Sequence, residues 1–407
     1  MGGRGAAGAS APVCLGFPGL DRPVVLPDDP ALIRALRACL TGWVADTVAV
    51  PVSGALDPVC TVDRHRGRFR LRSAFLAAPM TGLTVATAVC GVIADLAQGY
   101  AEARAGWRAL HCGAFAWGGR LVAVTGPARA GKSTLMARMT AEPGVAVFCD
   151  DVLPLRPDGL AVALGVAPRL RLPLPAPVSP AFRAHVADHI GPRDARYGYL
   201  CAPGIAPHGT VAPLAAFVVL DRRADGPARL HRLERSEAVW HLLAQTIGEV
   251  SPGLDPGAAL ELADRALDDV VCLRLVYAGL EDAVACLRQA FDAPDWPGVP
   301  PAEPVPAVPP VAVTAVPRAA VWARATGVAV RRRGAGTFLW RLGGQDLFAL
   351  DAVAGAIWTL LEVPGSADDL AATLVRVFPD VGFDRLASDA ACLLAQMQAA
   401  GLVEPAG

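Results

Sequence analysis

Residues 121–134 read LVAVTGPARAGKST, a short apolar run followed by a glycine-rich loop and the start of a helical pattern. The loop meets the pattern G-x-x-x-x-G-K-[ST] through Gly126, Gly131, Lys132 and Ser133, and a strand before it and a helix after it are the context that this pattern requires. Glycines let the backbone wrap around an anion, and the amino end of the helix adds partial positive charge. The stretch therefore predicts a loop that binds the phosphates of a nucleotide.

The basic residues of the chain single out the same loop. Lysine and arginine together number 37, and Lys132 is the only lysine among them. Its ammonium suits the β and γ phosphates of ATP, and the Ser133 hydroxyl suits Mg²⁺. Arg129 and Thr134 are expected to complete this site. The alternative, an accidental glycine-rich turn, is disfavoured by the flanking elements and by the position of the single lysine.

Length, charge and hydropathy limit the class of protein. The chain has 407 residues, of which 53% are hydrophobic, enough for two or three domains with sizeable cores. A formal net charge of −1 gives no general attraction to nucleic acid or to an anionic membrane. The apolar run over residues 82–94 is shorter than the roughly 20 residues that span a bilayer, and residues 1–13 lack the apolar core of a signal peptide. Ten scattered cysteines without a CxxC pair indicate reduced thiols, so we expect a cytoplasmic protein.

Composition and periodicity divide the chain into four regions. Residues 1–105 predict a mixed α/β region with a β-hairpin pattern, and residues 106–292 an α/β domain. Residues 293–318 form a proline-rich spacer, and residues 319–407 a separate small domain. In the α/β domain we expect strands over 121–125, 145–149 and 215–220, and helices over 134–139, 237–247, 258–267 and 280–291.

Two aspartates end the strand expected over 145–149. Asp150 and Asp151 would face the same crevice as the glycine-rich loop, because the carboxyl ends of parallel strands meet at one edge of an α/β sheet. One carboxylate can hold a metal ion, and the other can take a proton from an attacking hydroxyl. A solvated Asp-Asp turn is the alternative interpretation.

A longer run, LHCGAFAWGGRLVAVTGPARAGKSTLMARM followed by VAVFCDDVLPL, resembles the HPr kinase/phosphorylase family and its relatives, which share a nucleotide-binding fold with ATP-dependent phosphoenolpyruvate carboxykinases. The resemblance covers about residues 100–285 and implies that Asp150 is the catalytic base and Asp151 a metal ligand. It also implies that His111 lies near the phosphates, although a hydrogen-bonded core histidine is equally compatible. Residues 1–105 do not resemble the N-terminal domain of that family, so the resemblance does not establish the protein HPr as the substrate.

The run APRLRLP resembles the segment that returns basic residues to the site in these relatives. Arg169 and Arg171 are two residues apart and therefore share one face of an extended strand. They could clamp phosphate, or they could form a solvated strand face. Arg193 and Arg196 are weaker candidates for the same role.

Residues 320–405 resemble the PqqD family, a small winged-helix-like module that serves as a recognition element in enzymes that modify ribosomally made peptides. The resemblance rests on short strands expected over 328–332, 337–341 and 346–349, and on the helical runs DLFALDAVAGAIWTLLE and GSADDLAATLVRVF and a last helix ending AAGLVE. It implies that this module holds the leader of a precursor peptide, which an edge strand can accept by β-augmentation. Leu386, Leu393 or Met397 could line the groove or simply pack the core. The helices carry too few basic residues for a DNA reader.

These patterns together predict an α/β P-loop kinase domain joined to a winged-helix peptide-binding domain. The expected activity is ATP-dependent phosphorylation of a serine or threonine of a precursor peptide, with Mg²⁺ and with Asp150, Lys132 and His111 as catalytic residues. A nucleotide-binding scaffold for a peptide-modifying enzyme and a kinase of a small hydroxylated molecule are the alternatives. The resemblance to HPr kinases implies a homo-oligomer, without indicating an interface. The residues expected to bind the nucleotide are Gly126, Arg129, Gly131, Lys132, Ser133, Thr134, Arg169 and Arg171.

Overall fold

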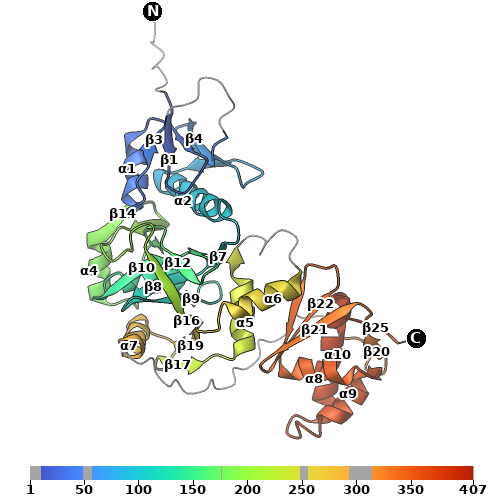
Figure 1. Cartoon of the computed structure of the whole chain (residues 1–407). Coiled ribbons are helices and arrows are strands. Elements are labelled where there is room, and N and C mark those ends of the chain that lie inside the picture. The colour runs from blue at the N-terminus through green and yellow to red at the C-terminus, as the bar shows by residue number, and fades with distance from the viewer. Residues whose placement is uncertain (1–10, 49–56, 176, 248–254, 293–313, 407) are drawn as a thin grey trace, which may run out of the picture. The chain divides into compact units, whose positions relative to one another are not determined.

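The computed structural model describes residues 11–48, 57–175, 177–247, 255–292 and 314–406, which form two compact units (Figure 1). The first unit holds the described residues up to His231, together with 245–247 and 269–292. The second unit holds residues 232–244, 255–268 and 314–406. Most of the proline-rich spacer predicted over 293–318 lies outside the described residues.

The first unit begins with a six-stranded sheet in the order β3-β1-β2-β4-β5-β6, against which two helices pack. The predicted hairpin is confirmed by β4 and β5, whose turn places Arg66 and Gly67 at φ angles of 51° and 77°. The apolar run over 82–94 is largely helix α2, which begins at a capping box formed by Thr84 and Thr87. The elements are β1 (Val13–Gly16), β2 (Val24–Leu26), α1 (Pro30–Ala38), β3 (Asp46–Thr47), β4 (Cys60–His65), β5 (Arg68–Ser73), β6 (Met80–Leu83) and α2 (Val85–Glu102).

A ten-stranded mixed sheet follows, and it positions the glycine-rich loop. Strand β9 (Arg120–Thr125) pairs in parallel with β16 (Val211–Arg222), which pairs in parallel with β19 (Val271–Tyr277). Strand β10 (Val145–Cys149) runs in the same direction as β9, because β8 (Gly113–Trp117) lies between them antiparallel to both. The carboxyl ends of β9 and β10 therefore reach the same edge of the sheet, as predicted. The remaining strands are β7 (Arg108–His111), β11 (Val152–Leu155), β12 (Leu160–Val162), β17 (Arg229–Arg232) and β18 (Thr246–Ile247).

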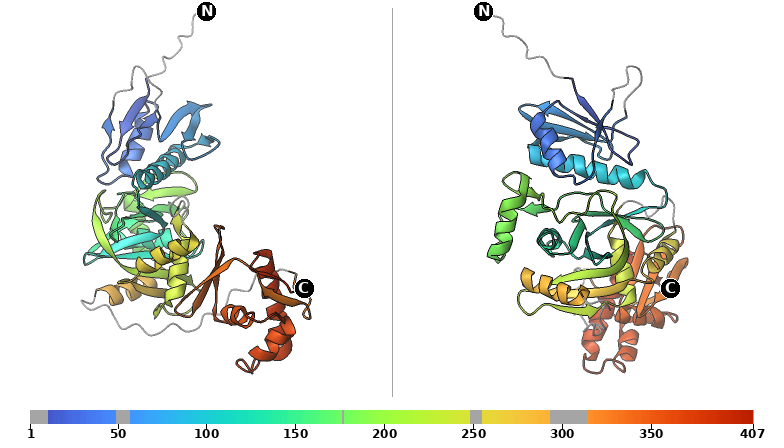
Figure 2. Two further views of the ribbon diagram at one scale, coloured as in Figure 1. Left: turned by 45° about the vertical axis from the view of Figure 1, so that its right-hand side comes forward. Right: turned by 60° about the vertical axis from the view of Figure 1, so that its left-hand side comes forward.

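Helices and a small sheet cover the ten-stranded sheet. Helix α3 (Lys132–Met139) begins two residues before the predicted start, and α7 (Leu280–Phe291) has the predicted bounds. Both contribute to one core with the central strands, through Leu135, Met136 and Leu287 among others. In Figures 1 and 2, α2 lies between the N-terminal sheet and the ten-stranded sheet. The small sheet and its helix, which the sequence patterns did not predict in full, are β13 (Arg169–Arg171), α4 (Pro180–His189), β14 (Ile190–Arg193) and β15 (Tyr197–Leu200).

The second unit contains the predicted C-terminal domain. Strands β21 to β23 form an antiparallel sheet within two residues of the predicted bounds, and the expected caps of α8 and α9, Asp351 and Ser366, are confirmed. A second sheet, in the order β24-β20-β25, was not predicted. The elements are β20 (Val321–Arg324), β21 (Val328–Arg333), β22 (Gly336–Arg341), β23 (Leu347–Leu350), α8 (Ala352–Leu360), β24 (Gly365–Ser366), α9 (Ala367–Leu374), α10 (Phe383–Ala399) and β25 (Val403–Pro405).

Two helices from before the spacer belong to this second unit. Helices α5 (Arg235–Ala244) and α6 (Pro256–Arg265) correspond to the helices predicted over 237–247 and 258–267, although α5 ends earlier and Thr246 already lies in β18. We predicted that both belong to the α/β domain of residues 106–292. The structure groups them instead with the second unit, where Gly257 of α6 approaches the Trp340 ring and Ser236 of α5 approaches Gly336 of β22.

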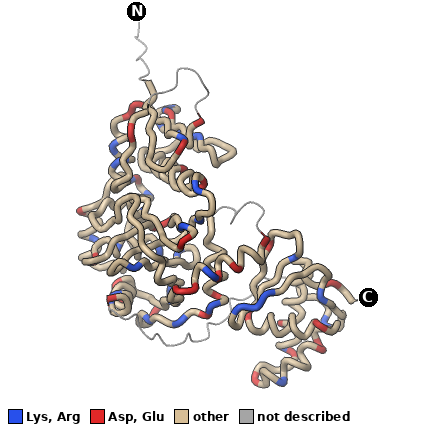
Figure 3. The backbone as a smooth tube through the Cα atoms, viewed as in Figure 1, with Lys and Arg blue, Asp and Glu red and all other residues tan. Residues whose placement is uncertain are grey.

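None of the helices within the described ranges combines the length and the apolar character that crossing a bilayer requires. Basic and acidic residues are interspersed along each unit in the view of Figure 3. This distribution agrees with the formal net charge of −1.

Candidate functional site

The loop of residues 126–131 connects β9 to the amino end of α3, and its two glycines are required by the backbone. Gly126 has a φ of 151°, and a Cβ there would lie 3.0 Å from the Leu220 carbonyl oxygen. Gly131 caps α3 with a φ of 100°, and a Cβ there would lie 2.6 Å from Tyr277 Oη. Tyr277 Oη donates a hydrogen bond to the Ala130 carbonyl and so holds the loop against β19. Other side chains would strain both positions.

Lys132 spans this loop. Its Nζ donates a hydrogen bond of 2.9 Å to the Gly126 carbonyl, and burial lowers the pKa of the ammonium, against the opposing effects of Cys112 and Asp151. Arg129 adopts a φ of 68°, a left-handed conformation unusual for a residue other than glycine. The loop thus places a partly buried cation at the amino end of a helix, where an anion is favoured.

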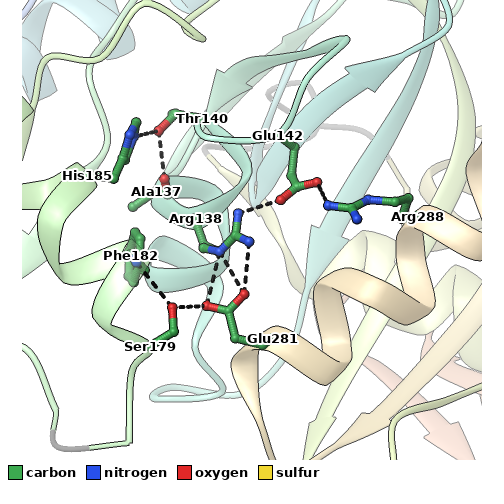
Figure 4. A network of polar contacts seen from close by, with 9 residues as sticks. All are labelled: Ala137, Arg138, Thr140, Glu142, Ser179, Phe182, His185, Glu281 and Arg288. Carbon is green, nitrogen blue, oxygen red and sulfur yellow. Dashed lines mark hydrogen bonds and ion pairs between the residues drawn. The ribbon is translucent and has the colours of Figure 1, made fainter.

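Helix α3 is held in place by a network of buried and half-buried charges (Figure 4). Arg138 of α3 donates to both carboxylate oxygens of Glu281 on α7, at 3.1 and 3.0 Å, and to Glu142 Oε1 at 2.5 Å. Arg288 of α7 donates to the other oxygen of Glu142, and Ser179, which caps α4, donates to Glu281 at 2.6 Å. The network therefore ties the helix that follows the loop to both of its neighbours.

Asp150 follows β10 and is almost completely buried, with 7% of its surface exposed. Its Oδ2 accepts a hydrogen bond of 2.9 Å from the Arg169 backbone N–H. Burial raises the pKa of this carboxyl to about 7, and the neighbouring charge of Asp151 adds to the increase. Asp150 is therefore a carboxyl group that gains and loses a proton near neutral pH.

Asp151 is exposed and has the opposite electrostatics. Its Oδ1 lies 3.1 Å from Nε2 of His111, which ends β7, and the hydrogen bond from His111 lowers the pKa of the Asp151 carboxyl. His111 itself is exposed, so its interpretation as a core histidine is wrong. The two residues meet because β7 and β11 pair with His111 opposite Val152.

Arg169 turns its side chain toward α2, whereas Arg171 is exposed. Arg169 Nη1 donates to Cys90 Sγ, and its guanidinium lies 5.0 Å from the centre of the Tyr197 ring. The predicted pair thus has one member at the site, since Arg171 does not line the cavity described next. Arg196 lies in the turn after β14, where its backbone N–H donates to Asp194 at 2.8 Å.

A cavity of about 210 Å³ joins these groups. Ser133, Asp150, Asp151 and Arg169 supply its polar side, so residues far apart in sequence converge on one space. The opposite wall comes from α2, which sequence patterns did not connect with the site. The available signal was the helical spacing of its small and apolar members, Cys90, Ile93, Ala94 and Ala97.

The described residues contain no group of three or more His, Cys, Asp or Glu side chains able to hold a metal ion. Ser133 and Asp151 nevertheless share the cavity. This donor set fits Mg²⁺, which keeps several waters and is usually bound through one or two carboxylates together with substrate phosphates. These two side chains alone would not supply all the ligands of the ion.

In the C-terminal domain, strand β23 is the edge of its sheet within the described ranges, because it pairs with β22 alone. Leu386 and Met397 of α10 are buried in the core, and Leu393 packs partly against it. Leu386 and Met397 therefore pack the core and do not line a groove. Arg333 Nε lies 2.7 Å from Asp264 of α6, so the basic run of β21 is partly paired.

Comparison with known families identifies this last region. Residues 334–403 match the family model described as coenzyme PQQ synthesis protein D (PqqD). The C-terminal part of the chain is therefore a PqqD domain, which confirms the resemblance seen in its strands and helices. No curated protein matches the chain. The matched residues do not include the 126–131 loop or the cavity beside it.

Proposed function

We propose that the chain is an ATP-dependent kinase that phosphorylates a serine or threonine hydroxyl of a ribosomally made precursor peptide. The PqqD domain would hold the leader of that peptide. One observation carries the proposal: Ser133, Asp150, Asp151 and Arg169 converge on a single cavity beside the amino end of α3, in a chain that also has a PqqD domain.

Phosphate binding is assigned to the 126–131 loop and the first turn of α3. The glycine backbone and the helix amino end present N–H groups, and Lys132 exchanges its bond with the Gly126 carbonyl for the phosphates. Mg²⁺, bound with the phosphates by Ser133 and Asp151, would neutralise charge on the transferring phosphoryl group. The His111 contact keeps Asp151 ionised for that role.

Asp150 is assigned as the general base. As the peptide hydroxyl oxygen bonds to the γ-phosphorus, its proton passes to the Asp150 carboxylate, and the bond between the phosphorus and the leaving oxygen of ADP breaks. A pKa of about 7 suits a base at neutral pH. The bond from the Arg169 backbone fixes the orientation of the carboxylate, and the Arg169 guanidinium is available to the phosphoryl oxygens.

The PqqD domain offers the free edge of β23 to an extended leader. A tethered leader raises the concentration of the rest of the peptide at the cavity without requiring tight contacts there. This explains why one chain would carry both modules.

A kinase of a small hydroxylated molecule is the second candidate. It is favoured by the modest cavity volume of about 210 Å³ and by the apolar wall that α2 provides. A nucleotide-binding scaffold for a partner enzyme is the third, and it requires no acceptor in the cavity.

The deciding experiment is mass spectrometry of the precursor peptides encoded beside the gene, incubated with the full chain, ATP and Mg²⁺. We expect a gain of one phosphate with the wild-type protein and none with Lys132→Ala, because the loop then lacks its phosphate cation. Peptide that binds but stays unmodified, while ATP is bound, would favour the scaffold. Turnover of ATP with a small hydroxylated acceptor and no modified peptide would favour the second candidate.

A further inference from the structure

The second unit contains a cavity of about 360 Å³ between α5 and the β22–β23 pair. Its C-terminal wall includes the sheet face formed by Phe338 and Ala349, which lie opposite each other in the strand pairing. The other wall is α5, through residues that precede the spacer and lie outside the PqqD match. The cavity is lined by Glu234, Ser236, Glu237, Trp240, Ala335, Gly336, Phe338, Ala349, Leu350, Asp351 and Ala352.

Close contacts define this cavity as a built feature of the unit. Glu234 Oε1 accepts a hydrogen bond of 2.8 Å from the Ala335 backbone N–H. A Cβ on Gly336 would lie 2.4 Å from the Ser236 Cβ, and a Cβ on Gly257 would lie 2.6 Å from the Trp340 ring. These glycines allow α5 and α6 to approach the sheet. Phe338 is consequently only 1% exposed.

The residues that line this cavity are a mixture of apolar and acidic side chains. Trp240 keeps 37% of its surface exposed, and Glu234, Glu237 and Asp351 supply three carboxylates, whereas no lysine or arginine lines the cavity. Glu234 and Asp351 already accept backbone hydrogen bonds, and Glu237 Oε1 lies 3.7 Å from His241 Nε2, but a carboxylate has about four acceptor positions and keeps capacity for a cation. An aromatic surface beside carboxylates suits a long basic side chain, whose stem is apolar and whose end is charged.

We propose that this cavity is a subsite for one lysine or arginine side chain of the bound precursor peptide. The proposal rests on the assigned peptide binding at β23. A peptide strand added to that edge presents alternate side chains to the face that carries Phe338 and Ala349, and therefore to the cavity. The stem packs on Trp240, and the cation lies among the carboxylates. Helix α5 thus selects the peptide, although it lies outside the PqqD match.

The test is selection of a random library of peptides about 12 residues long, displayed on mRNA, against the immobilised full chain. We expect an enriched motif with one fixed basic position. Both Glu237→Gln and Trp240→Ala should reduce enrichment of that basic residue about tenfold while keeping the apolar part of the motif. Asp380→Asn removes the same charge from an exposed loop residue and should change nothing. Thermal unfolding shows whether each variant is folded. If Trp240→Ala does not fold, Glu237→Gln, which is isosteric, still tests the inference.

The outcomes separate this inference from the proposed kinase. A motif without a basic position, or one that Glu237→Gln leaves unchanged, overturns the inference alone. Failure to enrich any peptide overturns the inference together with peptide recognition. An enriched basic motif on peptides that are never phosphorylated supports the subsite and removes only the kinase assignment.

Discussion

Asp150 and Asp151 are adjacent in the sequence, yet their surroundings shift their pKa values in opposite directions. Burial raises the pKa of Asp150 to about 7, whereas the hydrogen bond from His111 lowers that of the exposed Asp151. Two titratable groups whose environments separate their pKa values are a common arrangement in active sites. The difference assigns the proton-accepting role to Asp150 and leaves Asp151 as the permanent anion.

The first prediction concerns the pH dependence of phosphorylation. Because the base must be ionised, we expect the rate to increase as the pH rises through about 7, the pKa of Asp150, and to be low at pH values below this pKa. Asp150→Asn should lower the turnover number by on the order of 10²-fold or more and remove this dependence. Initial rates at saturating ATP and Mg²⁺ check both statements. A wild-type rate that is flat across this range would contradict the assignment of Asp150.

At the level of elements, α2 carries a second buried carboxyl, Asp95, which is 5% exposed. Its Oδ1 accepts a hydrogen bond of 2.8 Å from Ser73 Oγ, and its pKa is raised to about 6 by burial. A folded-state pKa above the ordinary value of 3.8 means that the folded chain binds this proton more tightly than the unfolded chain. The free energy of unfolding therefore falls as the pH rises from about 4 to about 6.

The second prediction follows for Asp95→Asn. The variant removes the buried charge, so it should be more stable than the wild type by about 3 kcal/mol at neutral pH, and should show little difference near pH 4, where the wild-type carboxyl is already protonated. Urea unfolding of both proteins at the two pH values measures the difference. Equal stabilisation at both pH values would mean that ionisation of Asp95 is not the cause.

The third prediction concerns the network of Figure 4. Glu142 is 5% exposed and accepts from both Arg138 and Arg288, so Glu142→Gln removes the charge that joins them and turns one of the two buried acceptor oxygens into an N–H donor facing an arginine. We expect a loss of about 3 kcal/mol in the free energy of unfolding. Glu281→Gln, at a more exposed position, should cost less than about 1 kcal/mol. Similar losses for the two variants in urea unfolding would count against a special role of the buried carboxylate.

At the scale of the whole chain, the second unit is assembled from three separate stretches of sequence. Leu339 of β22 packs into the core with α8, α9 and α10, so the neighbouring Phe338 and Trp340 point to the other face of the strand. Both are buried, at 1% and 5% exposure, in a unit whose other face is covered by α5 and α6. The PqqD domain is thus not independent of the residues before the spacer.

The fourth prediction concerns a fragment of residues 314–406. Without α5 and α6 this fragment exposes Phe338 and Trp340, and an exposed apolar patch of that kind promotes association. We expect it to elute above its monomer size and to bind a hydrophobic dye, unlike the full chain. Size-exclusion chromatography and dye fluorescence measure this. A monomeric fragment that does not bind the dye would show that α5 and α6 are not needed to keep Phe338 and Trp340 out of solvent.

Local patterns predicted much of this chain, and the successes share a physical cause. The turn at Gly126, the caps Asp351 and Ser366 and the three strands of the C-terminal sheet each depend on residues close in sequence. The helix predicted over 237–247 ends at Ala244 instead, because Thr246 pairs with Leu110 of β7. Such distant pairing leaves no mark in the local periodicity.

The amino-acid sequence by itself determined the glycine-rich loop with its single lysine, the aspartates at the end of β10 and the PqqD domain, since these are written in short runs of residue types. Only the tertiary structure decided that α2 walls the cavity, that Arg169 and not Arg171 lines it, and that α5 and α6 complete the C-terminal unit. The raised pKa of Asp150 belongs to the same group, because burial is a property of the packed chain. Packing brings together segments whose spacing in the sequence carries no information about their contact.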